Sequence, residues 1–123
     1  MNYFLTLGSI FGLLAVLIGA FGAHGLEDSL SEHALARYHT GVDYQLYHVG
    51  ALLVVGLLSS QIQSKQLIIS GWFFIVGIIL FSGSLYIYAL TGNKVFGMIT
   101  PLGGFGFIIG WVFLLLFSLN SDK

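Results

Sequence analysis

Residues 1–26 read MNYFLTLGSIFGLLAVLIGAFGAHGL and contain no Asp, Glu, Lys or Arg. Three more charge-free windows follow along the chain, at Tyr44–Ser64, Gln66–Asn93 and Val95–Ser121. A helix of about 20 predominantly apolar residues crosses the hydrocarbon core of a bilayer, which is roughly 30 Å thick. A charge at the centre of that core is costly. Each window is long enough to cross once, so the sequence predicts an all-α integral membrane protein, a four-helix bundle.

The composition agrees with this fold class. Of the 123 residues, 57% are hydrophobic and 7% are charged, and the mean hydropathy is +0.96, whereas about a quarter of the residues in a soluble domain are charged. Four spans leave no room for a second domain, so we expect residues 1–123 to form a single transmembrane domain. The absence of cysteine excludes disulfides and thiolate metal sites. A formal net charge of -1 gives no basic surface for nucleic acid.

The first window has a competing interpretation, a signal peptide, because it is N-terminal, apolar and followed by small residues near Ala23. No Lys or Arg precedes the apolar run, and residues 3–23 are longer than the core of an ordinary signal peptide. We therefore interpret this window as a membrane-spanning helix.

The predicted spans cover about residues 3–23, 42–59, 67–90 and 96–119. A short amphipathic segment, about residues 30–41, is expected between the first two spans, because five of the nine charged residues lie between Leu26 and Asp43. Four crossings place both termini on one side of the membrane. Lys65, Lys123 and the terminal amine lie on that side, against Arg37 and Lys94 on the other, so the positive-inside rule weakly favours cytoplasmic termini.

The start of the amphipathic segment carries a helix-capping pattern. Ser29 followed by Glu32 predicts a capping box and a helix that begins near Leu30. This helix either leads directly into the second span or lies flat on the membrane with a bend near Thr40 and Gly41. The sequence leaves both arrangements open.

Small residues recur at helical spacing in two of the spans. In the first span they follow a 4-3-4-3 repeat, which keeps them on one stripe of the helix where backbones approach closely. We expect the first span to be the central packing element, and the fourth to have a similar face. The predicted packing residues are Gly8, Gly12, Ala15, Gly19 and Gly22 in the first span and Gly103, Gly106 and Gly110 in the fourth. Pro101 is tolerated because it lies near the start of its helix.

Polar side chains inside the spans form the candidate site. Its members are His24, Tyr44, Gln45, Tyr47, His48, Ser82 and Ser84. At membrane depth such groups are expected to face the bundle interior and to bond to one another. The favoured interpretation of His48 is a neutral imidazole bonded to a serine, tyrosine or carbonyl. The alternatives are a proton relay or ligand contact, and a metal or haem ligand that pairs with His24 near the same membrane face.

The sequence gives little reason to expect a metal site or a catalytic site. His39 and Asp43, four residues apart, match a surface ion pair better than a metal site. No nucleophile elbow surrounds Ser82 or Ser84, so we expect no catalytic residues, no metal site and no cofactor. Trp111, like Trp72, lies near a predicted helix end, where it either anchors the helix at the interface or packs between helices.

Four motifs carry a resemblance to a known family. They are GAFGAHGL (19–26), YQLYH (44–48), LFSGSLY (80–86), and PLGG (101–104) with GW (110–111). In these motifs, which occur in order over nearly the whole chain, the protein resembles the YgdD/YwdK-like family of small bacterial membrane proteins, domain of unknown function 423. The resemblance implies four helices, a multi-pass place in the bacterial cytoplasmic (inner) membrane and a Gram-positive source. It implies no activity.

The leading functional hypothesis is a small non-enzymatic membrane protein that supports membrane integrity or stabilises partner membrane proteins. Its partners would be the lipid bilayer, further copies of the chain or other membrane proteins, without nucleic acid. The alternative is a ligand-binding or transport module that uses the polar cluster around His24 and His48 for a lipid headgroup, a metal, a proton or haem.

Overall fold

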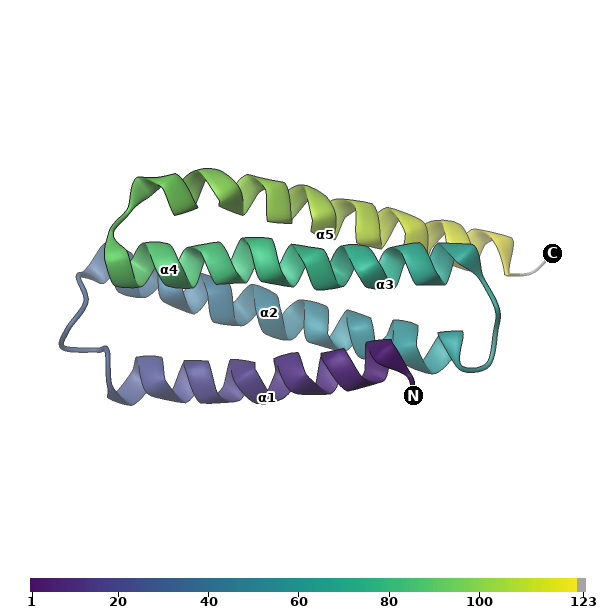
Figure 1. Cartoon of the computed structure of the whole chain (residues 1–123), viewed down its shortest axis with the longest axis horizontal. Coiled ribbons are helices and arrows are strands. Elements are labelled where there is room, and N and C mark those ends of the chain that lie inside the picture. Colours follow the sequence, from purple (N-terminus) through teal and green to yellow (C-terminus); the bar gives the residue numbers. More distant parts are fainter. Residues whose placement is uncertain (122–123) are drawn as a thin grey trace.

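The computed structural model describes residues 1–121, and within that range every regular element is a helix. The elements are α1 (Tyr3–His24), α2 (Glu32–Ser59), α3 (Lys65–Gly77), the π-helix η1 (Ile78–Ser82), α4 (Gly83–Thr91) and α5 (Lys94–Asn120). Because α3, η1 and α4 are continuous, they form one span, and residues 1–121 contain four helices long and apolar enough to cross a membrane. The helices run alternately up and down, so Met1 lies at the same end of the bundle as the end of α5 (Figure 1). The predicted fold class is confirmed.

Each membrane-spanning helix begins at a polar cap. The side chains of Asn2, Ser31, Ser64 and Asn93 accept hydrogen bonds from backbone amides in the first turns of α1, α2, α3 and α5. These bonds satisfy donors that a helix start leaves unpaired. The predicted capping box of Ser29 and Glu32 is wrong, because Ser31 is the cap of α2, and its Oγ lies 3.2 Å from the Ala34 amide nitrogen.

The predicted amphipathic segment 30–41 and the predicted span 42–59 are one helix. α2 continues without a break from Glu32 to Ser59, 28 residues, so its length is about 42 Å. That exceeds the roughly 30 Å of the hydrocarbon core. Of the two arrangements that the sequence allowed, the structure has the direct continuation, and there is no bend at Gly41.

The third and fourth spans differ from the prediction in detail. The third contains a π-helical turn, Ile78–Ser82, in which the amide of Gly83 bonds to the carbonyl of Ile78. In the fourth, α5 begins at Lys94, so Pro101 lies about two turns inside the helix rather than in its first turn. Pro101 is exposed on the surface of α5.

The spans pack in sequence order rather than around one central helix. α1 packs on α2, α2 packs on the span formed by α3, η1 and α4, and that span packs on α5 (Figure 1). The largest fully buried side chains are Phe74, Leu52, Leu67 and Val55, which lie on α2 and α3. Only 17% of the apolar window of α1 is buried, against 50% of that of α2. The expectation that the first span is the central packing element is therefore wrong.

The stripe of small residues on α1 faces α2. A Cβ atom added at Gly8, Gly12 or Gly19 would lie 2.9 to 3.3 Å from side-chain atoms of Leu53, Val49 and Val42, respectively. Gly22 meets the ring of Tyr38 in the same way, and Ala15 is fully buried. Small side chains let the two backbones approach closely. Because this stripe is narrow, it serves a single neighbour and leaves the rest of α1 exposed.

The glycines of α5 face α3 and η1. An added Cβ would meet the Phe81 backbone at Gly103, the Gly77 backbone at 3.4 Å at Gly106, and the Phe74 ring at 2.7 Å at Gly110. Here two of the three contacts are with backbone atoms, so α5 lies closer to its neighbour than side chains of ordinary size would allow.

Candidate functional site

The structure buries four of the seven predicted site residues. Gln45, His48, Ser82 and Ser84 are at most 5% exposed. Each of them makes a hydrogen bond, and no buried side-chain nitrogen or oxygen within residues 1–121 lacks a partner. A buried polar group without a partner is costly at membrane depth, so the bonds of these four residues decide what they can do chemically.

Both ring nitrogens of His48 are in use. The indole Nε1 of Trp111, which can only donate, lies 3.0 Å from His48 Nε2. Nε2 is therefore an acceptor, so the proton is on Nδ1, which lies 2.7 Å from the Tyr44 carbonyl oxygen and donates to it. The imidazole also stacks on the Phe107 ring, with centroids 3.5 Å apart and planes within 7°. This arrangement fixes one neutral tautomer and leaves no lone pair for a metal or haem iron.

Gln45 connects three spans. Its Nε2 donates to the carbonyl oxygen of Phe11 on α1 at 2.7 Å, and its Oε1 accepts from the hydroxyl of Tyr86 on α4 at 2.6 Å. A neighbouring tyrosine, Tyr38, donates to the carbonyl oxygen of Ile18 on α1. These bonds hold α1 and α4 on either side of α2.

Three buried serines form further hydrogen bonds between spans. Ser82 donates to the carbonyl oxygen of Gly41 on α2 at 2.7 Å, and Ser84 shares a 2.6 Å hydrogen bond with Thr100 of α5. Ser70, which is fully buried, donates to the carbonyl oxygen of Gly110 on α5 at 2.7 Å. The sequence analysis missed Ser70, although a lone serine in an apolar window is itself a signal of an interhelical bond.

A groove about 450 Å³ in volume opens between α2 and α5 beside His48. Its walls are mostly aromatic, and the lining residues are Tyr44, His48, Phe81, Gly104, Phe107, Ile108 and Trp111. Tyr44 is 41% exposed, and its ring lies 4.6 Å from that of Phe81, which belongs to the π-helix. The groove is thus an apolar recess that faces the membrane, with the Tyr44 side chain at its edge.

His24 and Tyr47 are not part of this constellation. His24 is exposed at the end of α1. Gly22 packs against Tyr38, so these two residues mark the same level of the bundle. His24 lies beyond this level on α1 and His48 lies in the opposite direction on α2, so the two histidines are separated by roughly 18 Å along the bundle axis. The two histidines do not lie near the same membrane face, as the haem hypothesis required. Tyr47 is exposed on the outer face of α2. Within residues 1–121, no three His, Asp or Glu side chains are grouped so that they could hold a metal ion.

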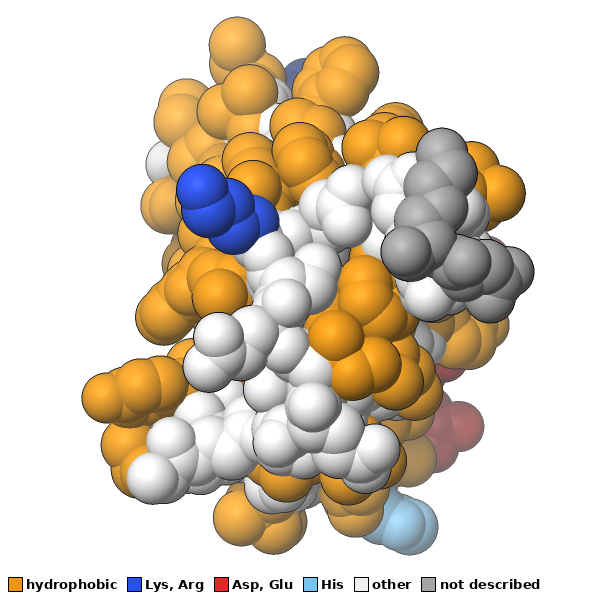
Figure 2. Space-filling model, turned by 90° about the vertical axis from the view of Figure 1, so that its right-hand side faces the viewer, with side chains coloured by type: hydrophobic (Ala, Val, Ile, Leu, Met, Phe, Trp, Pro, Cys, Tyr) orange, Lys and Arg blue, Asp and Glu red, His pale blue; other side chains and the backbone are white. Residues whose placement is uncertain are grey.

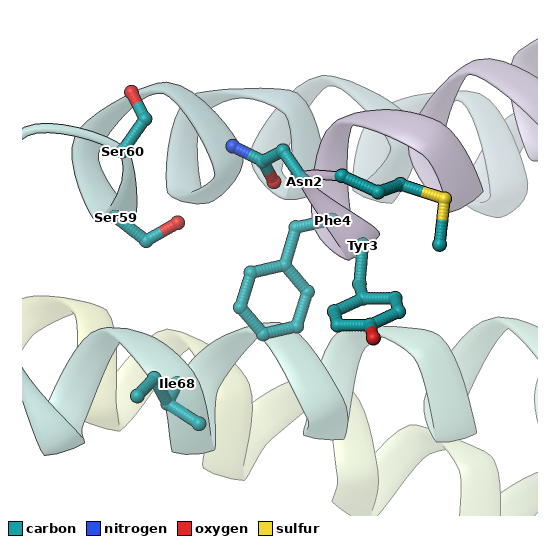
Figure 3. A pocket seen from close by; sticks show the side chains of 7 residues that line it. Asn2, Tyr3, Phe4, Ser59, Ser60 and Ile68 are labelled. Carbon is teal, nitrogen blue, oxygen red and sulfur yellow. The ribbon is translucent and has the colours of Figure 1, made fainter.

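A second pocket, about 420 Å³, lies at the end of the bundle that carries Met1. Tyr3 and Phe4 extend from the start of α1 toward α3, which carries Ile68, while Ser59, at the end of α2, points toward Phe4 (Figure 3). Asn2 Nδ2 donates to the Gly56 carbonyl oxygen at 2.8 Å. On this end of the molecule, polar side chains and backbone occupy the middle of the surface, surrounded by hydrophobic side chains (Figure 2). The polar surface is typical of an interface with water.

Fold and buried hydrogen bonds define an all-α integral membrane protein with four spans. The sequence pattern of one family, described as "Protein of unknown function (DUF423)", matches residues 18–104. The chain belongs to this family, which confirms the resemblance seen in its motifs.

Relatives cover nearly the whole chain. The UPF0382 membrane protein YwdK of Bacillus subtilis (strain 168) is 46% identical over 121 residues, 98% of each chain. The UPF0382 membrane protein SAB0533 of Staphylococcus aureus (strain bovine RF122 / ET3-1) is 47% identical over 116 residues, 94% of each chain. A UPF0382 membrane protein of Staphylococcus epidermidis (strain ATCC 12228) is 46% identical over 120 residues, 98% of each chain. No solved structure matches the chain. These names confirm the membrane class and state no activity.

Proposed function

We propose that this protein is a non-enzymatic structural component of the bacterial cytoplasmic membrane, which supports membrane integrity or stabilises partner membrane proteins. The proposal rests on one observation: the buried polar side chains form hydrogen bonds with neighbouring spans of the same bundle. Gln45, Ser70 and Ser82 each donate to a backbone carbonyl of a neighbouring span. Such bonds tie helices together.

The same bonds argue against a moving or reactive centre. Opening the bundle at α1 would break the Gln45 bond to Phe11, and opening it at α5 would break the Ser70 bond to Gly110. The Gln45 amide group and the Ser70 hydroxyl would then be left without an acceptor in hydrocarbon, where no water replaces the lost partner. A fixed arrangement of spans favours a scaffold over a transporter that alternates between states.

The outer surfaces of α1 and α5 supply the area that a scaffold needs. Only 17% of the apolar window of α1 and 28% of that of α5 are buried. Leu13 and Val16 of α1, and Leu102 and Phe105 of α5, are exposed apolar side chains. These two faces are available to lipid and to apolar surfaces of other membrane proteins.

A complementation experiment tests this role. The gene is deleted in its host, or that of the relative in Bacillus subtilis, and dye permeability, survival of membrane stress and the abundance of other membrane proteins are measured. We expect at least one of these to change. Gly103→Ala, which overpacks α5 against η1, should then complement poorly, whereas Tyr44→Phe, which removes only the hydroxyl beside the groove, should complement fully. A deletion that changes none of the three would refute the proposal.

A second candidate function rests on the groove between α2 and α5. Its aromatic walls and the Tyr44 side chain at its edge suit a membrane-soluble molecule with a flat ring. Native mass spectrometry of gently purified protein would detect such a ligand as a constant added mass. Gly104→Leu places a side chain in the groove and should remove that mass. If the wild-type protein carries no added mass, or if Gly104→Leu retains it, a ligand-binding role in this groove fails.

We also propose that both termini face the cytoplasm. Lys65, at the end of the bundle that carries Met1, and Lys123, which lies outside the described residues, support this orientation, and Arg37 and Lys94 oppose it. The chain has no native cysteine, so single cysteines at Gln63 and Asn93 can be compared with a membrane-impermeant thiol reagent on intact cells. Labelling at Asn93 alone is expected, and labelling at Gln63 alone would reverse the orientation.

A further inference from the structure

The outward face of α2 carries polar groups that the bundle does not use. Asp43 and Tyr47, one helical turn apart, are both exposed and lie on the same face. The inward face of the same helix directs Gln45 and His48 to bonds with other spans. Within residues 1–121, neither the Asp43 carboxylate nor the Tyr47 hydroxyl takes part in a hydrogen bond.

The neighbouring α4 shows how deep Asp43 lies. The Ser82 hydroxyl bonds to the carbonyl oxygen of Gly41, so these two residues mark the same level. From Ser82 the span continues to Thr91, about 13 Å farther along the axis. Leu90, close to its end, is an exposed apolar side chain. The level of Asp43 is therefore one at which α4 still has an apolar surface, and that surface extends well beyond it.

α1 gives the same result from the other side of α2. A Cβ atom at Gly19 would touch Val42, next to Asp43 in sequence. From that level α1 continues to His24, about 7 Å farther. Phe21, in this last part, is exposed and apolar. Two helices thus place Asp43 and Tyr47 inside the apolar band, where polar groups without partners are costly.

We propose that this face of α2 is the interface between two copies of the chain, related by a two-fold axis along the membrane normal. Such an interface is isologous, so each contact occurs twice. The Tyr47 hydroxyl is a donor and the Asp43 carboxylate an acceptor, one turn apart. Tyr47 of each copy donates to Asp43 of the other, and both polar groups are satisfied by a partner of identical sequence.

The residue one turn beyond Tyr47 allows the two helices to meet. Gly50 is exposed, and a Cβ atom added there would meet nothing within 4 Å of its own chain. A glycine on an outward face lets the backbone of a second helix approach closely. Val54 and Leu57 continue the same face as exposed apolar side chains. The α2 face therefore combines a close-approach point, apolar contact and a self-complementary pair of polar groups.

This inference does not depend on the scaffold role. If the protein does not form dimers, the gene-deletion experiment still tests the scaffold role. If gene deletion has no effect on the membrane, the cross-linking experiment still tests the dimer.

Cross-linking tests the interface directly. Because the chain contains no cysteine, Gly50→Cys introduces a unique thiol, and Leu13→Cys on α1 and Phe105→Cys on α5 are exposed controls. Under mild oxidation in native membranes, Gly50→Cys should form a disulfide dimer of twice the monomer mass at least tenfold faster than either control. Equal rates, or a product whose mass shows a different protein, would overturn the proposal.

A second measurement isolates the polar pair. Energy transfer between labelled copies in liposomes gives the association constant as the protein-to-lipid ratio is varied. Tyr47→Phe removes two reciprocal bonds of about 0.6 kcal/mol each, so association should weaken about eightfold. Tyr3→Phe, which also removes an exposed hydroxyl, is the matched control and should change nothing. If both variants associate like the wild type, Tyr47 does not bind the second copy and the inference fails.

Discussion

Two adjacent glycines of α5 provide a sharp test of the packing. Gly103→Ala and Gly104→Ala add the same methyl group to the same helix. At Gly103 the new Cβ would meet the backbone nitrogen of Phe81 and lie 2.7 Å from its Cα. At Gly104 the nearest atoms belong to the Phe81 ring, 3.9 Å away. The first contact is a steric clash with backbone, and the second is an ordinary van der Waals contact.

The expected magnitude follows from the distance. Carbon atoms pack at about 3.5–4.0 Å, so Gly103→Ala must push α5 away from η1 by about 1 Å. That shift also loosens the Ser84 bond to Thr100. Overpacking of this kind costs about 1–3 kcal/mol. The gain in helix propensity from glycine to alanine, up to about 1 kcal/mol in water, is the same in both variants and cancels in the comparison.

Reversible unfolding of the purified protein in mixed micelles, followed by circular dichroism as the denaturing detergent is increased, gives the free energy of unfolding. Gly103→Ala should be about 1–3 kcal/mol less stable than Gly104→Ala, and Gly104→Ala should equal or exceed the wild type. If the two variants differ by less than about 0.5 kcal/mol, the range of an ordinary surface substitution, α5 does not approach η1 as closely as described.

Substitutions at three further positions probe other parts of the bundle with the same assay. Gly12→Leu should lower the free energy of unfolding by about 1–3 kcal/mol, while Gly12→Ala, whose Cβ would lie 3.3 Å from a Val49 methyl and needs a shift of only a few tenths of an ångström, should cost less; equal effects would contradict the contact. His48→Ala should cost about 2–4 kcal/mol, because it leaves a cavity and removes the acceptor of the Trp111 indole, and in a Trp72→Phe background it should shift the fluorescence of Trp111; an unchanged spectrum would contradict the bond. Gly92→Ala should cost about 1–2 kcal/mol, because Gly92 has φ 70° in open space and only the left-handed backbone opposes a Cβ there; a neutral result would mean that this turn adopts another conformation.

The spans could be predicted because the length of each charge-free window can be counted along the sequence and compared with the thickness of the membrane. Predicted boundaries 3–23 and 96–119 differ from α1 and α5 by one or two residues. The π-helix could not be predicted, since a change in backbone hydrogen-bond register leaves no signature in side-chain type. The continuity of α2 was undecided for a related reason: Gly41 permits a bend, and the bond from Ser82 to its carbonyl comes from a residue far away in sequence.

The candidate site was predicted in part. Polarity at membrane depth correctly selected Gln45, His48, Ser82 and Ser84 as buried. It did not select Trp111 or Tyr86, which bond to two of them, because these partners lie 63 and 41 residues away in sequence and nothing local connects them to His48 or Gln45. It included His24, which is exposed. Whether a polar residue points inward depends on which faces of a helix are covered, and that follows from the order in which the spans pack.

Glycine and serine act together at the closest contacts of this bundle, and this leads to a final prediction. The carbonyl of Gly110 accepts the bond from Ser70, and a Cβ atom at Gly110 would lie 2.7 Å from the Phe74 ring. The short serine side chain reaches the carbonyl only because the missing side chain lets the helices approach. Gly41 is similar, since it accepts from Ser82 and lies against the Tyr86 ring.

If glycine and serine form one unit, their substitutions cannot be additive. Ser70→Ala should cost about 0.6–1.7 kcal/mol, from the average to the largest value measured for interhelical hydrogen bonds in a membrane protein. Gly110→Ala should cost more, because it separates the helices and breaks the same bond. The double variant should then cost about as much as Gly110→Ala alone, with a coupling energy close to the cost of Ser70→Ala. Ser118→Ala, whose hydroxyl bonds to Leu115 of its own helix, should add to Gly110→Ala without coupling. Simple additivity of Ser70→Ala and Gly110→Ala would show that the bond survives the separation of the helices, and the link between close approach and hydrogen bonding would be refuted.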